Sequence, residues 1–316
     1  MQGPKPKKKN IDTNRKNLVE SSVLTAVGAI FILMGTYVPF LSFLTMFSAV
    51  PIVIITYRNK VSYALMSSFS LGVILSFFIH PINALFTSIM FFIPGIAIGF
   101  FAKENRPPFE SIFYGFLSMT FTTALIIQFV SFFMDLNLIE YLMEILRESM
   151  EIQTELLKNL PSIEAVDINA ITLTIRLLFP SFIVGFAIIT SFLNYYMSAA
   201  IIRRLGEKKN LGSLLEFSMP GNVSIGIIVI YLLTYITSTL NFQYYDSLVA
   251  NLTAVFILLF FLQGASVAGF FINKMKAPKP VKIVIVAMLI ILAPISSFIA
   301  LVGFVDALFN FRRLNR

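Results

Sequence analysis

The sequence has no cysteine and a single histidine, His80, and each scarcity removes a class of function. Without cysteine, neither disulfides nor thiolate metal sites can form. With one histidine a zinc-binding HExxH motif cannot be assembled, and His80, at a predicted turn before Pro81, gives poor support for a histidine-based catalytic triad. A glycine-rich phosphate loop ending in Lys-Ser/Thr is also missing, so the chain does not hydrolyse nucleotides by that motif. We therefore predict a protein that is not an enzyme and that holds no cofactor or metal.

Charged residues are scarce as well, and apolar residues take their place. Only 13% of the 316 residues are charged and 57% are apolar, with a mean hydropathy of +0.85. A soluble domain carries about a quarter charged residues. Apolar runs of roughly 18 residues are typical of bilayer-spanning helices, because lipid offers no partner to open backbone groups. The sequence therefore predicts an all-α, polytopic transmembrane helical bundle. The predicted spans are 18–38, 41–57, 61–80, 82–102, 109–134, 180–202, 222–241, 247–273 and 281–311.

Most of the 24 basic residues fall in every second loop between these spans. This is the positive-inside pattern, and it places the N-terminus in the cytoplasm. The net charge of +8 then indicates contact with anionic lipid heads rather than with nucleic acid. We predict a multi-pass protein of the bacterial plasma membrane. The basic residues concerned are Lys5, Lys7, Lys8, Lys9, Arg15, Lys16, Arg58, Lys60, Lys103, Arg106, Arg203, Arg204, Lys208, Lys209, Lys274, Lys276, Lys279 and Lys282.

One segment between spans differs from the rest. Residues 135–168 repeat apolar side chains at the helical period, from Ile139 to Leu160, with glutamates on the opposite face. We predict an amphipathic helix outside the membrane. Its apolar face would pack on the outer rim of the bundle; a solvated connector is the default interpretation of the segment, and a lid over a central cavity is the more specific alternative. The predicted organisation is a basic tail 1–17, a transmembrane region 18–134, an acidic segment 135–179, a second transmembrane region 180–311 and a basic tail 312–316.

Prolines indicate where spans break. Pro51 predicts that the short second span is broken or tilted. Pro180 is predicted to begin the sixth span as a first-turn proline, which leaves 171–179 at the outer interface. The two Pro-Gly pairs, 94–95 and 220–221, are interpreted as helix-end punctuation.

The last predicted span, 281–311, is too long for one upright crossing and contains Pro294. It could be one kinked, tilted helix or two half-helices that fold back. We favour one kinked span. Two half-helices would instead leave Arg312, Arg313 and Arg316 on the cytoplasmic side, in keeping with the other basic loops.

Polar side chains inside the membrane are costly and therefore informative. Each also has a structural explanation, because Asn, Gln and Ser often bridge transmembrane helices. In the QGAS stretch (263–266), the small residues favour close approach of two helices. Asn251 and Tyr196 belong to the same class of buried polar group. The candidate ligand-binding residues are Gln128, Arg176, Asn194, Tyr195, Gln263 and Asp306.

Asp306 stands in an otherwise apolar run near the end of the sequence. An ionised, unpaired carboxylate deep in lipid is very unfavourable, so it must lie near a surface, pair with a cation or be protonated. Arg312 and Arg313 follow six and seven positions later. Arg176 is a further potential partner if 281–311 crosses the membrane once. A helix-end ion pair is the main interpretation, and a binding or proton-transfer role is the alternative.

The stretches SSVLTAVGAIFILMGTYVP (21–39), PIVIITYRNKVSYALMSSFSLGVILSFF (51–78) and FIPGIAIGFFAKENR (92–106) resemble the S components of energy-coupling-factor vitamin transporters. The resemblance covers about residues 18–134. It implies a central cavity for a vitamin-like ligand and a small-residue first helix that docks on a coupling partner with an ATPase module. Small side chains permit such close approach. The docking residues would be Ser22, Ala26 and Ala29, with Thr25 in the alternative pair.

Over its whole length the chain more closely resembles the YybS-like family of uncharacterised bacterial membrane proteins. RRLG (203–206), QGAS (263–266) and VDALFNFRR (305–313) carry this resemblance, together with the acidic outer segment. It implies no biochemical activity. Two functions therefore stay open: binding or helping to transport a small, vitamin-like ligand, or a non-transporting scaffold that assembles other membrane proteins.

Overall fold

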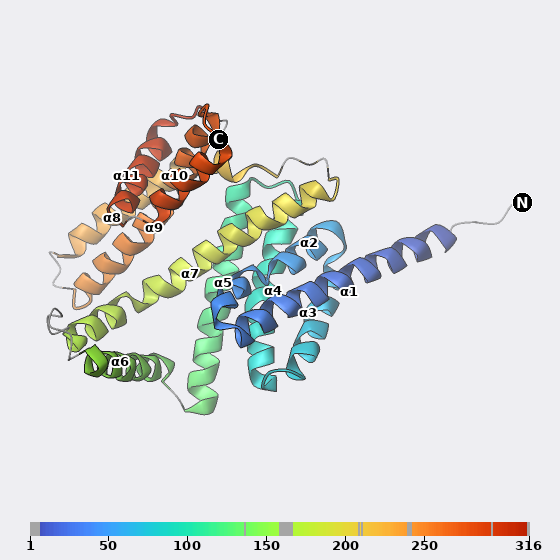
Figure 1. The fold of residues 1–316 in the computed structure, drawn as a ribbon, viewed down its shortest axis with the longest axis horizontal. Coiled ribbons are helices and arrows are strands. Elements are labelled where there is room, and N and C mark those ends of the chain that lie inside the picture. The colour runs from blue at the N-terminus through green and yellow to red at the C-terminus, as the bar shows by residue number, and fades with distance from the viewer. Residues whose placement is uncertain are drawn as a thin grey trace, which may run out of the picture. The chain divides into compact units, whose positions relative to one another are not determined.

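The computed structural model describes residues 7–135, 137–157, 167–207, 209, 211–238, 242–291 and 293–314. Within these ranges the chain is helical apart from turns and short connections, which confirms the all-α prediction (Figure 1). The elements are α1 (Lys7–Tyr37), η1 (Pro39–Phe47), α2 (Val50–Arg58), α3 (Val61–Ser76), α4 (Pro81–Lys103), α5 (Pro108–Met134), α6 (Leu138–Leu157), α7 (Ile168–Arg204), η2 (Leu214–Glu216), α8 (Gly221–Thr237), α9 (Tyr245–Lys274), α10 (Lys279–Ile291) and α11 (Ala293–Phe309).

Six helical stretches of the described residues are long and apolar enough to cross a bilayer. Three shorter apolar helices accompany them: Val61–Ser76, Gly221–Thr237 and Ser297–Phe309. The six long stretches are Thr13–Tyr37, Pro39–Arg58, Pro81–Lys103, Pro108–Phe133, Ile168–Arg204 and Tyr245–Lys274. Their length and composition are those of a multi-pass membrane protein.

The termini of the predicted segments differ from expectation. α1 begins at Lys7, so most of the basic stretch 1–17 is part of the first helix, while residues 1–6 lie outside the described residues. The acidic segment forms α6, whose side chains are nowhere fully buried over 138–153. Residues 158–166, which include Lys158 and Leu160, lie outside the described residues, as do Lys208 and Arg316.

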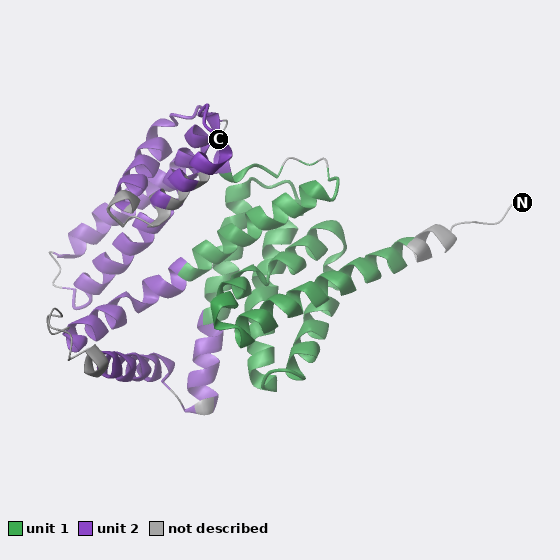
Figure 2. Ribbon diagram, viewed as in Figure 1, with its two compact units in different colours: residues 1–123, 186–214 green, residues 124–185, 215–316 purple. Residues whose placement is uncertain are grey.

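The chain divides into two compact units (Figure 2). Unit 1 consists of residues 1–123 and 186–214, and unit 2 of residues 124–185 and 215–316. The division falls inside α5 and inside α7, so each of these helices contributes one part to each unit.

α2 forms the centre of unit 1. Every residue from Val50 to Tyr57 is buried, which is the pattern of a helix enclosed on all sides. As Pro51 predicted, the second apolar stretch is broken: the 3-10 helix η1 ends at Phe47, and α2 begins at Val50 with Pro51 in its first turn. The short predicted span is therefore an interior helix.

Two glycines of α4 bring it against α2. A Cβ on Gly95 would lie 2.9 Å from the Ile52 Cβ, and one on Gly99 would lie 2.6 Å from the Val53 carbonyl oxygen. Small residues four apart allow this approach. The interpretation of Pro94-Gly95 as helix-end punctuation is wrong, because both lie inside α4. For the second pair it is confirmed, since α8 begins at Gly221 directly after Pro220.

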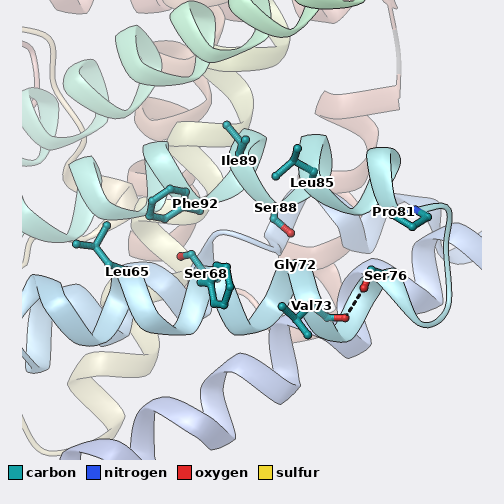
Figure 3. A pocket seen from close by; sticks show the side chains of 11 residues that line it. Leu65, Ser68, Gly72, Val73, Ser76, Pro81, Leu85, Ser88, Ile89 and Phe92 are labelled. Atoms are coloured by element: carbon teal, nitrogen blue, oxygen red, sulfur yellow. Dashed lines mark hydrogen bonds between the residues drawn. The ribbon is translucent and has the colours of Figure 1, made fainter.

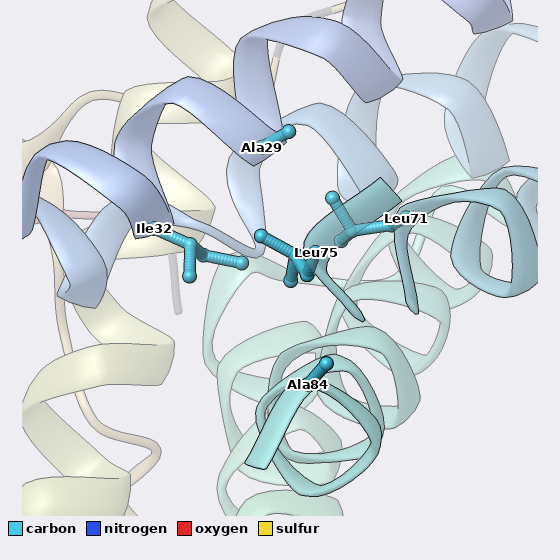
Figure 4. Packing of buried hydrophobic residues seen from close by; sticks show 5 residues of the cluster. All are labelled: Ala29, Ile32, Leu71, Leu75 and Ala84. Carbon is cyan, nitrogen blue, oxygen red and sulfur yellow. The ribbon is translucent and has the colours of Figure 1, made fainter. Parts of the chain in front are cut away.

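A cluster of small and branched side chains joins α1, α3 and α4 in unit 1 (Figure 4). Ala29 and Ile32 of α1 pack against Leu71 and Leu75 of α3, with Ala84 of α4 completing the cluster. The spacings from Ala29 to Ile32 and from Leu71 to Leu75 place each pair on one helix face. This cluster fixes the distance between α1 and α3 at one point along their length.

In unit 2, α9 and α11 touch backbone to backbone. A Cβ on Gly264 would overlap the Ile299 carbonyl oxygen, and a Cβ on Gly303 would overlap the Phe260 carbonyl oxygen. Contacts this close permit Cα–H···O interactions between the helices. The prediction that the QGAS stretch serves close helix approach is confirmed.

The chain after α11 returns to the side of unit 2 where α8 begins. Arg312 donates hydrogen bonds to the carbonyl oxygens of Leu215 and Phe217, which lie just before Gly221, the first residue of α8. α8 leads away from that side and α9 leads back to it. α10 starts on this side, and Arg312, after α11, lies on it again. α10 therefore runs away from this side, and α11 runs back to it. The favoured single kinked span over 281–311 is therefore wrong, and two helices that fold back replace it.

This arrangement predicts the side of the C-terminal residues. Reporters fused after Arg316 and before Met1 should label the same face of the membrane, since the α10–α11 pair adds no crossing. Matched alkaline phosphatase and green fluorescent protein fusions measure this directly. Opposite sides for the two fusions would contradict the folded-back pair.

Candidate functional site

Asp306 and Arg312 form an ion pair that is fully buried in unit 2. The Arg312 Nη2 lies 2.9 Å from Asp306 Oδ2, and neither side chain is accessible to solvent. Gln263 of α9 donates to the same carboxylate oxygen at 2.7 Å and accepts from the Met219 backbone N–H at 3.0 Å. The helix-end ion pair is thus the correct interpretation of Asp306. Arg176 is not its partner, because it pairs with Glu140 at 3.8 Å with both side chains exposed.

The Arg312 guanidinium uses its donors on groups from three parts of unit 2. Nε and Nη2 donate to Asp306 Oδ2, Nη1 donates to the Ser266 hydroxyl at 2.8 Å, and the remaining bonds reach Leu215 and Phe217. A planar guanidinium presents five N–H groups in a fixed fork, and five bonds are made here. The segment 215–219 is thereby held against α9 and α11. We call this network of Gln263, Ser266, Asp306 and Arg312 the C-terminal clamp.

The turn that follows α11 explains how Arg312 reaches Asp306 from six positions away. α11 ends at Phe309, and Asn310 adopts a left-handed conformation with φ +48° while its N–H donates to the Asp306 carbonyl oxygen. Asparagine at this position is a common way to end a helix. The chain then doubles back, which brings the guanidinium under the carboxylate. The clamp is a structural element with its hydrogen-bonding capacity engaged, and it offers little to a ligand.

The side chain of Asn251 on α9 forms hydrogen bonds with the backbone of α7 on both sides of Pro180. Its Nδ2 donates to the Leu177 carbonyl oxygen at 2.8 Å, and its Oδ1 accepts from the Ser181 N–H at 2.8 Å. These two backbone groups would pair with each other in an uninterrupted helix. Pro180 lacks an N–H and opens the helical ladder, and the Asn251 amide fills the opening. The prediction that a span begins at Pro180 is therefore wrong: α7 runs through it from Ile168.

The amide bridge predicts a specific pair of stability effects. Asn251→Leu should lower the unfolding free energy by about 1–3 kcal/mol, because it leaves two backbone groups without partners in an apolar setting. Adding Pro180→Ala should recover much of this loss, since alanine allows α7 to close its own ladder. Denaturation in detergent, followed by circular dichroism, measures both. An undiminished loss in the double variant would show that the bridge does not act through Pro180.

The remaining polar candidates of α7 also bind backbone groups. Asn194 donates to the carbonyl oxygens of Met46 and Thr190, both at 2.7 Å, and the Tyr195 hydroxyl donates to Leu211 at 2.9 Å. All these contacts lie within unit 1. The side chains thus bridge helices and connections, as the structural alternative predicted.

The other candidate residues are dispersed. Gln128 is exposed on α5. Ser22 and Ala26 are exposed on α1, but Ala29 is 5% exposed and belongs to the cluster of Figure 4. Ala29 is therefore a packing residue, and the predicted docking face is reduced to Ser22 and Ala26. Among the candidates of unit 2, Gln263 and Asp306 meet, whereas Gln128 is exposed on α5 and Arg176 is exposed on α7. Asn194 and Tyr195 belong to unit 1.

A groove that the sequence analysis missed lies between α3 and α4 in unit 1 (Figure 3). It has a volume of about 370 Å³, and we call it the α3–α4 groove. Ser68, Gly72 and Ser76 follow one another at intervals of four along α3, so small residues form its floor. That spacing is a small-xxx-small pattern visible in the sequence. The groove is lined by Leu65, Ser68, Phe69, Gly72, Val73, Ser76, Pro81, Leu85, Ser88, Ile89 and Phe92.

The serine hydroxyls of the α3–α4 groove are bonded to their own helices. Ser68 donates to Ala64 at 2.8 Å, while Ser76 and Ser88 donate to Val73 and Ala84 at 2.7 Å. Their oxygens can still accept, but the rest of the lining is aliphatic or aromatic. The groove therefore suits a largely apolar molecule with few polar groups.

Comparison with known proteins places the chain beside other membrane proteins. The profile of a family described as "Predicted membrane protein (DUF2232)" matches residues 26–307. The chain is 26% identical over 307 residues to the "Uncharacterized protein YybS" of Bacillus subtilis (strain 168), covering 93% of this chain and 97% of that protein. The full-length resemblance seen in the sequence is confirmed. No solved structure matches.

Proposed function

The chain belongs to the DUF2232 family of predicted membrane proteins, and on this premise we propose that it binds a small, largely apolar ligand in the α3–α4 groove. The groove carries the proposal. Its volume of about 370 Å³ falls within the range of small-molecule sites. It lies in the part of the chain that resembles transporter S components, whose role is to hold such a ligand. Binding without catalysis fits the lack of catalytic groups in the sequence.

The residues that line the α3–α4 groove indicate the route by which a ligand enters and how polar the ligand is. Leu65 and Leu85 are about half exposed and Phe69 is 77% exposed, so the groove opens at the surface of unit 1. In a membrane protein such a surface meets lipid. Because the hydroxyl donors are engaged, a charged ligand would lose its hydration without gaining partners. We therefore propose an apolar or weakly polar, vitamin-like compound that enters from the bilayer.

Filling the groove tests the proposal. A Cβ on Gly72 would lie 3.3 Å from the Ser88 hydroxyl, so Gly72→Leu places its side chain between α3 and α4. Intact-complex mass spectrometry of the purified protein should show a bound small molecule that Gly72→Leu loses. Gly226→Leu is the matched control, since a Cβ there meets no atom within 4 Å. Equal ligand content in wild type and Gly72→Leu, with both folded, would refute the groove as the site.

Transport would need an energising partner, because the sequence carries no phosphate loop. We propose a separate coupling and ATPase module that meets the exposed Ser22 and Ala26 of α1. Co-purification of a nucleotide-hydrolysing module, or a rise in melting temperature with a vitamin-like compound, supports transport. Neither result is required for ligand binding alone.

The second candidate function is a scaffold for other membrane proteins. It is favoured by α6, where Tyr141, Ile145 and Ile152 are 43–59% exposed on a helix predicted to lie outside the membrane. Exposed apolar side chains outside lipid are typical of interaction surfaces. Cross-linking from position 145 to a specific membrane partner, in a protein that retains no ligand, would favour this function over the first.

A further inference from the structure

A second hollow lies on the opposite face of α3, against α1. Its inner part has a volume of about 180 Å³, with Leu18, Ser21 and Thr25 of α1 facing Met66, Ser67 and Ile74 of α3. An outer hollow of about 510 Å³ shares Leu18, Tyr63 and Met66 with it. We call the two together the α1–α3 cleft.

The outer part of the α1–α3 cleft is positively charged. Arg15 and Lys60 line it, and no acidic residue is among its described lining residues. Glu20, further along α1, already pairs with Arg58 at 2.5 Å. Arg15 lies one turn before Leu18, where the apolar part of α1 begins, and Lys60 directly precedes Val61, the first residue of α3. Both basic residues therefore lie at the start of an apolar segment. That level corresponds to lipid headgroups.

The inner part of the α1–α3 cleft is lined by hydroxyl groups. Ser67, which is 5% exposed, lines it together with Ser21, Ser22, Thr25 and Ser70. Ser21 already accepts a hydrogen bond from Asn59 at 3.2 Å. A hydroxyl can both donate and accept, so these side chains suit a ligand with polar groups at that depth.

We propose that the α1–α3 cleft binds a phospholipid with an anionic headgroup. Arg15 and Lys60 contact the phosphate at the mouth. Ser67 donates to an ester oxygen below it, and an acyl chain extends beyond it along Ile74. The sequence of cationic, hydroxyl and apolar groups along the cleft matches the sequence of groups along a phospholipid. The site is separate from the α3–α4 groove and does not depend on the function proposed for it.

The absence of tryptophan from the chain allows a clean optical test. Ser70→Trp places a single fluorophore at the inner cleft. In the full-length protein reconstituted in phosphatidylcholine vesicles, brominated phosphatidylglycerol should quench it more strongly than brominated phosphatidylcholine. Two interfacial bases give a preference of up to about thirtyfold. Phe121→Trp, exposed on α5, serves as the reporter for bulk lipid and should show no comparable preference.

Variants of basic residues distinguish lipid binding in the α1–α3 cleft from non-specific attraction of anionic lipid to the protein. Arg15→Gln with Lys60→Gln should abolish the preference, whereas Lys276→Gln with Lys279→Gln, equally exposed bases of another turn, should leave it. Ser67→Ala should weaken quenching by both brominated lipids alike, because both carry the ester oxygens, with the melting temperature unchanged. Inorganic phosphate should not compete, because it lacks the chain. Equal quenching by both lipids, a preference that survives the Arg15/Lys60 change, or displacement by phosphate would each overturn the proposal.

Discussion

Replacing Arg312 with glutamine is expected to destabilise unit 2 by about 3–5 kcal/mol, the usual cost of removing one partner from a buried ion pair. The substitution leaves the Asp306 carboxylate without its cation at 0% exposure. It also removes the donors to the carbonyl oxygens of Leu215 and Phe217. Denaturation of the purified protein in detergent, monitored by circular dichroism, measures the change.

A double-mutant cycle measures the interaction energy between Asp306 and Arg312. Asp306→Asn combined with Arg312→Gln should cost clearly less than the sum of the single changes, because it removes both buried charges together. Arg313→Gln is the control, since Arg313 is exposed one residue further on. Additive single effects, or a loss at Arg313 as large as at Arg312, would show that the clamp does not hold unit 2 together.

The second large effect is expected where α9 crosses α11. Gly303→Ala adds a methyl group that overlaps the Phe260 carbonyl oxygen, so the helices must separate and lose contacts along their length. Overpacking of this kind costs about 1–3 kcal/mol, and more where the obstacle is backbone. Thermal unfolding of unit 2 should therefore occur at a clearly lower temperature. Gly264→Ala should act in the same direction, because its Cβ overlaps the Ile299 carbonyl oxygen.

The control for both glycines lies in α8. Gly226→Ala places its Cβ where no atom lies within 4 Å, and alanine is the better helix former by about 1 kcal/mol. It should be neutral or stabilising. If Gly303→Ala is as well tolerated as Gly226→Ala, the close crossing is not a feature of the folded protein.

Hydropathy predicted the long apolar helices, but it did not separate α10 from α11 and did not show how prolines and glycines act within the helices. Pro180 sits inside α7 because Asn251, seventy-one positions later, supplies the missing partners. Gly95 is an interior packing position because Ile52 lies against it. Both facts depend on contacts between distant segments, which local sequence does not contain. Pro51 could be interpreted correctly because its effect is local to the start of α2.

For the candidate site residues too, the sequence predicted local properties but not the contacts between distant segments. Polarity within the membrane correctly marked Gln263, Asp306 and Asn194 as buried groups that need partners. It also suggested Arg312 as a partner of Asp306. It could not show that Gln263 and Asn194 bind the backbone groups of Met219 and Met46, because these contacts join distant segments. The α3–α4 groove was missed because its lining is mostly apolar, and the sequence alone does not distinguish an apolar residue that lines a groove from one in a packed core.

α3 has a consequence for how the two hollows behave together. It is one helix thick, with Ser68 and Gly72 facing the α3–α4 groove and Met66 and Ser67 facing the α1–α3 cleft. With α1 and α4 held in place, a ligand that displaces α3 to enlarge one of these hollows makes the other smaller. Occupancies on the two sides are then antagonistic, and thermodynamic reciprocity requires each guest to weaken the other by the same factor. Displacement of α3 would then couple ligand binding in the α3–α4 groove to lipid binding in the α1–α3 cleft.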